Sequence, residues 1–93
     1  MNNITQHNGE ALTVENGQVA PFLPRKKSAL VFVQGTGTLT LHYSLDGEHW
    51  SQDDTTFDIT DTGSINIETY FMVQSFYKIT STGSITAARI RYE

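Results

Sequence analysis

The sequence predicts an all-β protein, an antiparallel β-sandwich or jelly roll of about seven or eight short strands. Three observations predict this fold class. β-Branched and aromatic residues are abundant, whereas strong helix formers are sparse. Turn pairs that contain glycine recur along the chain at spacings typical of short strands. One segment, 38–45, alternates strictly between apolar and polar residues, which indicates a strand with one buried face.

The segment 38–45 is the clearest strand. Its even-numbered positions are polar, and we expect them to face water. Its odd-numbered positions are predicted to face the core, and these are Leu39, Leu41, Tyr43 and Leu45.

The other strands are less regular. We expect a flexible N-terminal arm over residues 1–9 and a single domain over 10–93. Because proline cannot donate a hydrogen bond to a ladder, Pro21 and Pro24 predict that their strand lies at a sheet edge. The remaining strands are expected at 10–14, 18–23, 28–34, 57–60, 64–68, 70–80 and 84–92, where 70–80 is either one long strand or two strands with a bend.

Pairs containing glycine predict the turns. Asn16-Gly17 and Asp46-Gly47 are typical of tight hairpins, because both residue types tolerate positive φ. A Thr-Gly pair occurs three times, at residues 36–37, 62–63 and 82–83. The segments 58–65 and 78–85 resemble each other around two of these pairs. Two copies are too few for a solenoid, so we interpret them as the same short hairpin turn used twice.

Several strands carry apolar residues on both faces. In the last strand the apolar positions change face, and a β-bulge near Ala87-Ala88 would realign them. On the second face of other strands lie Met72, Phe76 and part of 30–33. These residues are either scattered exposed apolar side chains, which are common, or an interface with another subunit or with a host surface.

Composition excludes several classes of function. The chain has 93 residues, no cysteine and a net charge of −4 with only six Lys and Arg, so we expect one domain that binds no nucleic acid. The longest apolar run, 29–33, is too short to cross a membrane. We expect no disulfide, metal or cofactor.

Charged residues are unevenly distributed. Acidic residues dominate 46–68, which we interpret as a solvated loop, and the sequence leaves open whether 46–61 binds a cation. Arg25, Lys26 and Lys27 form a basic run. This run is either a docking patch for an acidic protein surface or a guard against aggregation of the apolar strand that follows.

No cluster of residues predicts catalysis. His42, Ser44 and Asp46 have the residue types of a catalytic triad. Alternate residues of a strand, however, lie roughly 7 Å apart, whereas triad members must lie within hydrogen-bond distance. We therefore expect a protein that is not an enzyme.

The segment Ser44-Leu45-Asp46-Gly47-Glu48-His49-Trp50 has the pattern S-x-D-G-x-x-W. It resembles a hairpin common in discoidin-like and other carbohydrate-binding sandwiches and in phage virion β-domains. We expect Trp50 to bury its ring over the hairpin. The alternative is that exposed Tyr43 and Trp50 stack on a sugar ring.

Taken whole, the chain resembles small bacteriophage virion proteins. The polar arm, the run 29–35, the S-x-D-G-x-x-W hairpin and the ending 76–92 carry this resemblance. It implies a capsid decoration (cement) protein, located in the virion, that binds and stabilises the capsid lattice. Its expected partners are the major capsid protein or another virion protein and further copies of itself, for example in a trimer. The predicted interface residues are Arg25, Lys26, Lys27, Met72 and Phe76. A carbohydrate-binding host-adhesion module and a head–tail connector or tail accessory protein are the alternatives.

Overall fold

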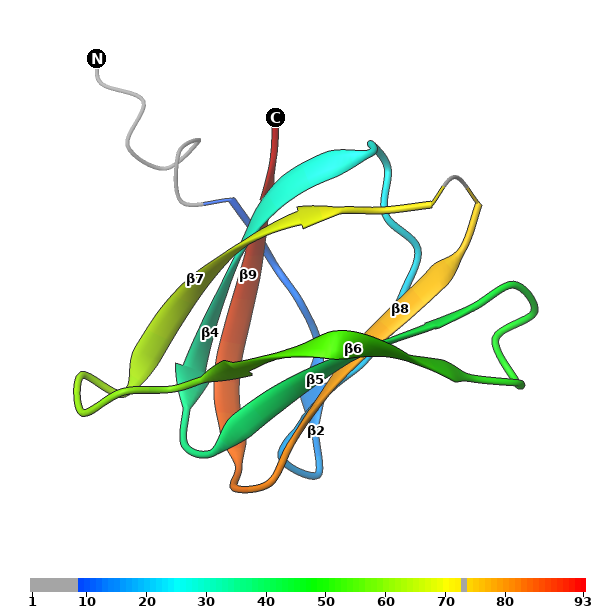
Figure 1. The fold of residues 1–93 in the computed structure, drawn as a ribbon. Helices are drawn as coiled ribbons and strands as arrows, with labels where there is room; N and C mark the ends of the chain where they lie inside the picture. The colour runs from blue at the N-terminus through cyan, green and yellow to red at the C-terminus, as the bar shows by residue number, and fades with distance from the viewer. Residues whose placement is uncertain (1–8, 73) are drawn as a thin grey trace, which may run out of the picture.

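The computed structural model describes residues 9–72 and 74–93, which form two antiparallel β-sheets packed face to face (Figure 1). These residues form nine strands and no helix. The predicted fold class, a small all-β sandwich, is therefore confirmed. The predicted arm, residues 1–9, lies outside the described residues except for Gly9, whose carbonyl accepts a 2.9 Å hydrogen bond from Arg89.

One sheet has four strands in the order β1-β9-β4-β7. β9 lies between β1 and β4, although it is the last strand along the chain. The edges of this sheet are β1 and β7. The strands are β1 (Glu10–Ala11), β4 (Ser28–Gly35), β7 (Ser64–Tyr70) and β9 (Ile85–Tyr92).

The other sheet has five strands in the order β2-β3-β8-β5-β6, with β2 and β6 at its edges. β2 pairs only with Gln18 and Val19 of β3. The half of β3 that holds Pro21 therefore lies at the edge, where no ladder needs its missing N–H. The strands are β2 (Val14–Glu15), β3 (Gln18–Phe22), β5 (Thr38–Ser44), β6 (Ser51–Asp58) and β8 (Phe76–Ser81).

The core lies between the inner faces of the two sheets. A Val, Leu, Ile or Phe side chain stabilises the fold by about 1.5–3 kcal/mol when it is fully buried. Near one end of the sandwich an aromatic pair closes the core, with the rings of Phe71 and Tyr77 4.7 Å apart and inclined at 66°. The buried apolar residues are Val19, Ala29, Val31, Val33, Leu39, Ile67, Phe71, Tyr77, Ile79, Ile85, Ala88 and Ile90.

The predicted bulge in the last strand is present, one position earlier than expected. Gln34 pairs with Ala87, whereas Gly35 pairs with Ile85, so Thr86 is the extra residue. The bulge turns Ile85 and Ala88 toward the same core. It explains why the apolar positions change face in the sequence.

The segment 70–80 is two strands in different sheets. β7 ends at Tyr70 and β8 begins at Phe76, and the residues between them carry the chain from one sheet to the other. The predicted boundary between the strands 64–68 and 70–80 is wrong. β7 continues through residue 69 to Tyr70 in an unbroken register with β4.

The acidic segment after residue 50 is also a strand. β6 spans Ser51–Asp58 and pairs with β5, whereas the sequence predicted a strand only at 57–60 and a solvated loop before it. Its side chains are mostly exposed because β6 is an edge strand. The alternation rule missed it because neither of its faces is apolar along most of its length.

The three Thr-Gly pairs do not form hairpins, which corrects the prediction. Each joins a strand of one sheet to a strand of the other: β4 to β5, β6 to β7, and β8 to β9. The resemblance between 58–65 and 78–85 therefore reflects the same crossing between sheets, made twice. In the described part of the chain, the glycine-containing turns that join neighbouring strands of one sheet are Asn16-Gly17 and Asp46-Gly47. Asn16-Gly17 forms the predicted tight hairpin with positive φ at both residues. Asp46-Gly47 instead lies in a longer loop, 45–50, in which Gly47 but not Asp46 has positive φ.

The sandwich consequently has two different ends. All the Thr-Gly crossings and the Asn16-Gly17 hairpin meet at one end, which we call the turn end (Figure 1). There Thr36 N–H donates to the Ser84 carbonyl, Gly35 N–H to the Gly63 carbonyl, and Ile85 N–H to the Gly17 carbonyl. The opposite end, the loop end, is formed among the described residues by 23–27, 45–50, 71–72 and 74–75.

Candidate functional site

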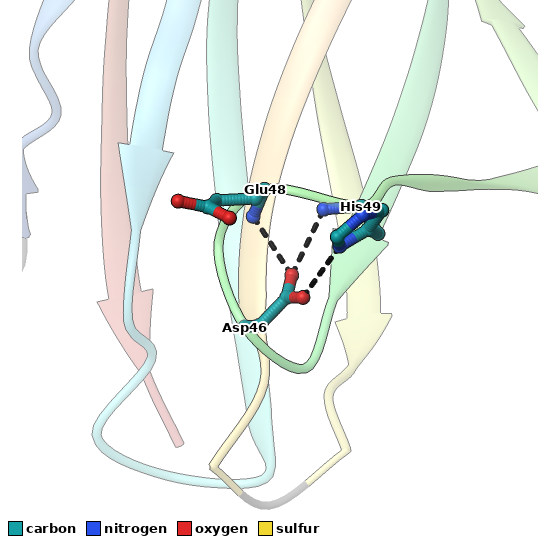
Figure 2. Close-up of side chains that lie close together, drawn as sticks. All are labelled: Asp46, Glu48 and His49. Carbon is teal, nitrogen blue, oxygen red and sulfur yellow. Dashed lines mark hydrogen bonds and ion pairs between the residues drawn. The ribbon is translucent and has the colours of Figure 1, made fainter.

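The hairpin 44–50 at the loop end is organised around two side chains. The buried Ser44 Oγ accepts hydrogen bonds from the N–H groups of Asp46, at 3.3 Å, and of Gly47, at 2.8 Å. Asp46 Oδ1 accepts hydrogen bonds from the N–H groups of Glu48 and His49, both at 2.8 Å (Figure 2). The Ser44 hydroxyl donates to the same oxygen at 2.9 Å. The sequence pattern S-x-D-G is therefore a hydrogen-bonded turn.

These hydrogen bonds set the charge state of Asp46. The N–H groups of His49 and Glu48, followed by the His49 ring and the Ser44 hydroxyl, hold the pKa of the Asp46 carboxyl well below its ordinary value of 3.8. The His49 Nδ1 atom lies 2.6 Å from Asp46 Oδ2. Asp46 is therefore ionised throughout the physiological pH range.

Asp46, Glu48 and His49 have ligand atoms within 4.8 Å of one another. Both Asp46 oxygens already accept hydrogen bonds within the turn, and all three residues are exposed (Figure 2). We assign no metal to this group, since the turn itself accounts for its geometry.

The strand that carries Ser44 ends there, and Leu45 leaves the core. Leu45 was predicted to face the core with Leu39, but 78% of it is exposed. The prediction is wrong because Ser44 begins the turn, so the alternation of β5 stops one residue earlier than the apolar pattern suggests.

The two rings predicted to stack on a sugar are not brought together. Tyr43 pairs with Tyr77 and packs against the core, its ring 6.3 Å from that of Tyr77. Trp50 is half-buried, and the Lys78 Nζ atom lies 4.5 Å from the centre of its ring. Lys78 alternates with the buried residues of β8 and so projects from the outer face. The expected burial of the Trp50 ring is thus partial, and Lys78 on the outer face of β8 contacts the ring.

His42 lies on the same outer face, opposite Lys78. Its Nε2 atom is 2.8 Å from the Thr80 hydroxyl oxygen. Burial, together with the charge of Lys78, lowers the pKa of His42. Ser44 and Asp46 hydrogen-bond to each other and not to His42 among the described contacts, so these three residues do not form a triad.

The predicted interface residues divide between two places. Phe76 lies half-buried beneath the hairpin, in van der Waals reach of Gly47. Met72 instead lies beside the basic run, and 47% of it is exposed. Its N–H donates a 2.7 Å hydrogen bond to the Tyr77 hydroxyl, which anchors its backbone to the core.

The basic run contains two kinds of side chain. Arg25 forms an ion pair with Glu10, and its guanidinium carbon lies 4.6 Å from the centre of the Tyr92 ring. Lys26 and Lys27 are exposed and form no ion pair with any residue in the described ranges. Arg25 is thus tied to the protein, whereas the two lysines are available to an acidic partner.

Met72 separates two surface depressions of the loop end. One, of about 370 Å³, is basic and includes Leu23, Phe71 and the run 25–27. The other, of about 450 Å³, includes Tyr43, Leu45 and Asp46. Met72 therefore borders both a hollow lined by basic residues and a hollow that holds Asp46 and His49.

Four large apolar side chains are exposed in the described residues, and all belong to the loop end or its margin. The sequence pattern indicated Met72 but not the other three. For Leu23 and Leu45 the signal was a proline or a turn directly after the strand end. The four are Leu23, Leu45, Tyr70 and Met72.

Among the described residues, no helix has the length and apolar character needed to cross a membrane. Comparisons with protein families, with curated proteins and with solved structures found no match to this chain.

Proposed function

We propose that this protein is a structural component of a bacteriophage virion, a capsid decoration protein that binds the capsid lattice through its loop end. The observation that supports this best is the concentration of exposed apolar side chains at one end of the sandwich. Proteins that act alone rarely gather such side chains, which instead mark binding surfaces. The resemblance of the sequence to small virion proteins supplies the class of partner.

The loop end has the composition of a protein-binding surface. Met72 and Leu23 supply apolar contact, while Lys26 and Lys27 favour an acidic partner. Among the described residues the turn end has no exposed large apolar side chain, and its crossings consist mainly of Thr, Ser, Gly and Asp. Binding by the loop end would thus leave the turn end facing the solvent. The mechanism requires no catalytic residue.

Co-sedimentation tests the proposal. The purified protein is mixed with expanded and unexpanded capsids of the phage that encodes it, and the pelleted fraction is measured. We expect saturable binding to expanded capsids. Met72→Glu should weaken it by roughly 30-fold or more, as expected for a central apolar anchor. Thr62→Glu, which adds the same charge at the turn end, is the matched control and should bind normally.

Absence of binding to either capsid form would refute the decoration function. Equal losses for Met72→Glu and Thr62→Glu would refute the loop end as the docking surface. Density for this protein at the tail or portal of the virion, instead of on the capsid lattice, would support the connector alternative.

A further inference from the structure

The four sheet edges differ in how well they are protected from pairing with another strand. β1 and β2 have only two residues each. β6 is long, but it carries Asp53, Asp54 and Asp58. Its register with β5 is also irregular between Thr40 and His42. Short length, charge and irregularity are the usual means by which proteins protect an edge.

β7 has none of these protections. It pairs with β4 over seven consecutive residues without a register shift. Its only charged residue is Glu68, and it contains no proline. Its outer edge is unpaired in the described structure. Tyr70, at its end, is the most exposed of the large apolar residues, at 85%.

We propose that β7 pairs antiparallel with β7 of a second copy of this chain, so that the two four-stranded sheets join into one continuous sheet. Antiparallel pairing of a strand with itself produces a two-fold symmetric dimer. This interface runs along the β7 edge and shares only Tyr70 with the loop end. The dimer and the proposed capsid binding are therefore tested through different residues, Asn66 and Met72.

Sequence and symmetry select one register. To keep both cores on the same side of the joined sheet, Ile67, which faces the core, must lie opposite a residue that also faces inward. Centring the pairing on Ile67 aligns all seven residues of β7. It places each Glu68 opposite Asn66 of the second copy, and each Tyr70 opposite Ser64.

The neighbouring registers are less favourable. Centring on Glu68 would place two carboxylates directly opposite each other, and like charges in that position are destabilising. Centring on Asn66 avoids this repulsion but pairs fewer residues of the strand. The same operation on β6 would line up three aspartates from each copy along the joined edges, and the β6 register with β5 is irregular, so β7 is the favoured edge.

Asn66 provides the first test, because its side chain is exposed and each register assigns it a different neighbour. Sedimentation equilibrium should detect a monomer–dimer equilibrium for the native chain. Asn66→Glu, which faces Glu68 twice per dimer, should raise the Kd by roughly 2- to 30-fold. Asn66→Lys should lower the Kd by a similar factor, and Asn66→Gln should change it little. Circular dichroism should show that all three variants are folded.

Cysteine cross-linking tests the register, and the chain has no native cysteine to interfere. In the proposed register the double variant Asn66→Cys/Glu68→Cys forms intermolecular disulfides under mild oxidation, because opposite Cα atoms lie within disulfide range. Either single variant should remain uncross-linked. A cross-link through Cys at position 66 alone, or at 68 alone, would overturn the register. A native chain that stays monomeric, with no cross-link in any variant, would overturn the dimer.

Discussion

Asp46 determines the shape of the 44–50 hairpin, because one of its oxygens accepts the N–H groups of two successive residues and the Ser44 hydroxyl. A carboxylate in this position stabilises the turn only while it is ionised. The stability of the protein should therefore depend on pH through this residue.

The folded-state pKa of Asp46 is below the unfolded value, so its contribution is complete above pH 4 and is lost as the pH falls further. We expect the free energy of unfolding to decrease below about pH 4. In Asp46→Asn, the part of this decrease in unfolding free energy that is due to Asp46 should be absent. Carbon-13 NMR titration of the carboxyl groups provides the direct measurement. A titration midpoint at the ordinary value would contradict the hydrogen-bonded turn.

The two most buried serines make opposite predictions. Ser75 is completely buried, and its hydroxyl has no hydrogen-bond partner in the described part of the chain. Ser75→Ala removes an unsatisfied polar group and should raise the free energy of unfolding by about 1 kcal/mol. Ser44→Ala removes a hydroxyl with three hydrogen bonds and should lower it by about 1–2 kcal/mol. Urea denaturation measures the free energy of unfolding of both variants. Equal losses would contradict the difference in hydrogen bonding between the two hydroxyls.

At the scale of elements, the Thr-Gly crossings tie the two sheets together. Ser81 and Thr36 illustrate this, since the Ser81 hydroxyl donates to the Thr36 carbonyl at 2.6 Å and the Thr36 hydroxyl accepts from Ser84 N–H at 3.1 Å. The crossings at 36–37 and 82–83 thus lie against each other, whereas a Cβ at Gly63 in the third crossing would have no atom within 4 Å. The requirement for glycine should differ between them accordingly.

Gly37 and Gly63 provide a matched pair of substitutions. Both have positive φ, 97° and 78°. A Cβ at Gly37 would overlap the Gly83 backbone, whereas a Cβ at Gly63 has no atom within 4 Å. Gly63→Ala should therefore cost about 1–2 kcal/mol, from backbone strain alone. Gly37→Ala should cost at least about 2 kcal/mol more. Thermal unfolding distinguishes the two, and similar losses would show that the crossing can relax around Gly37.

Local pattern predicted the elements better than it predicted their partners. The alternation in 38–45 identified a strand correctly except for Leu45, and the residue types of Asn16-Gly17 identified a tight hairpin. Asp46-Gly47 marked the position of a hairpin but not the length of its loop. Whether a Thr-Gly turn returns within a sheet or crosses to the other one depends on contacts between residues distant in sequence, such as Gly35 with Gly63. β6 escaped prediction because an exposed edge strand needs no apolar face.

The candidate site shows the same division. The basic run and Met72 were identified, but nothing in the sequence places them beside each other, since they are brought together by the Phe71 N–H to Lys27 carbonyl hydrogen bond. Phe76 was grouped with Met72 because both were assigned to one strand. The break at 71–75 separates them.

At the scale of the whole molecule, the loop end and the β7 edge meet only at Tyr70, and variants at residues of one surface alone should separate their functions. Met72→Glu should lose capsid binding but keep the dimer mass. Asn66→Glu should weaken the dimer and still bind capsids at high protein concentration. It removes only the extra affinity that a dimer gains when its two loop ends bind one capsid together. Sedimentation of both variants, alone and with capsids, measures this. A variant that loses both activities while remaining folded would contradict the separation.

The position of β9 has a consequence for the order in which the chain folds. It is the last strand of the domain to leave the ribosome, yet it lies in the middle of its sheet and joins β1 to β4. Until it arrives, β4 has a partner only in β7, and its other edge presents an apolar strand without cover. The sandwich therefore completes only after synthesis of the domain, and a stop codon within 85–92 would remove the centre of a sheet instead of trimming its margin.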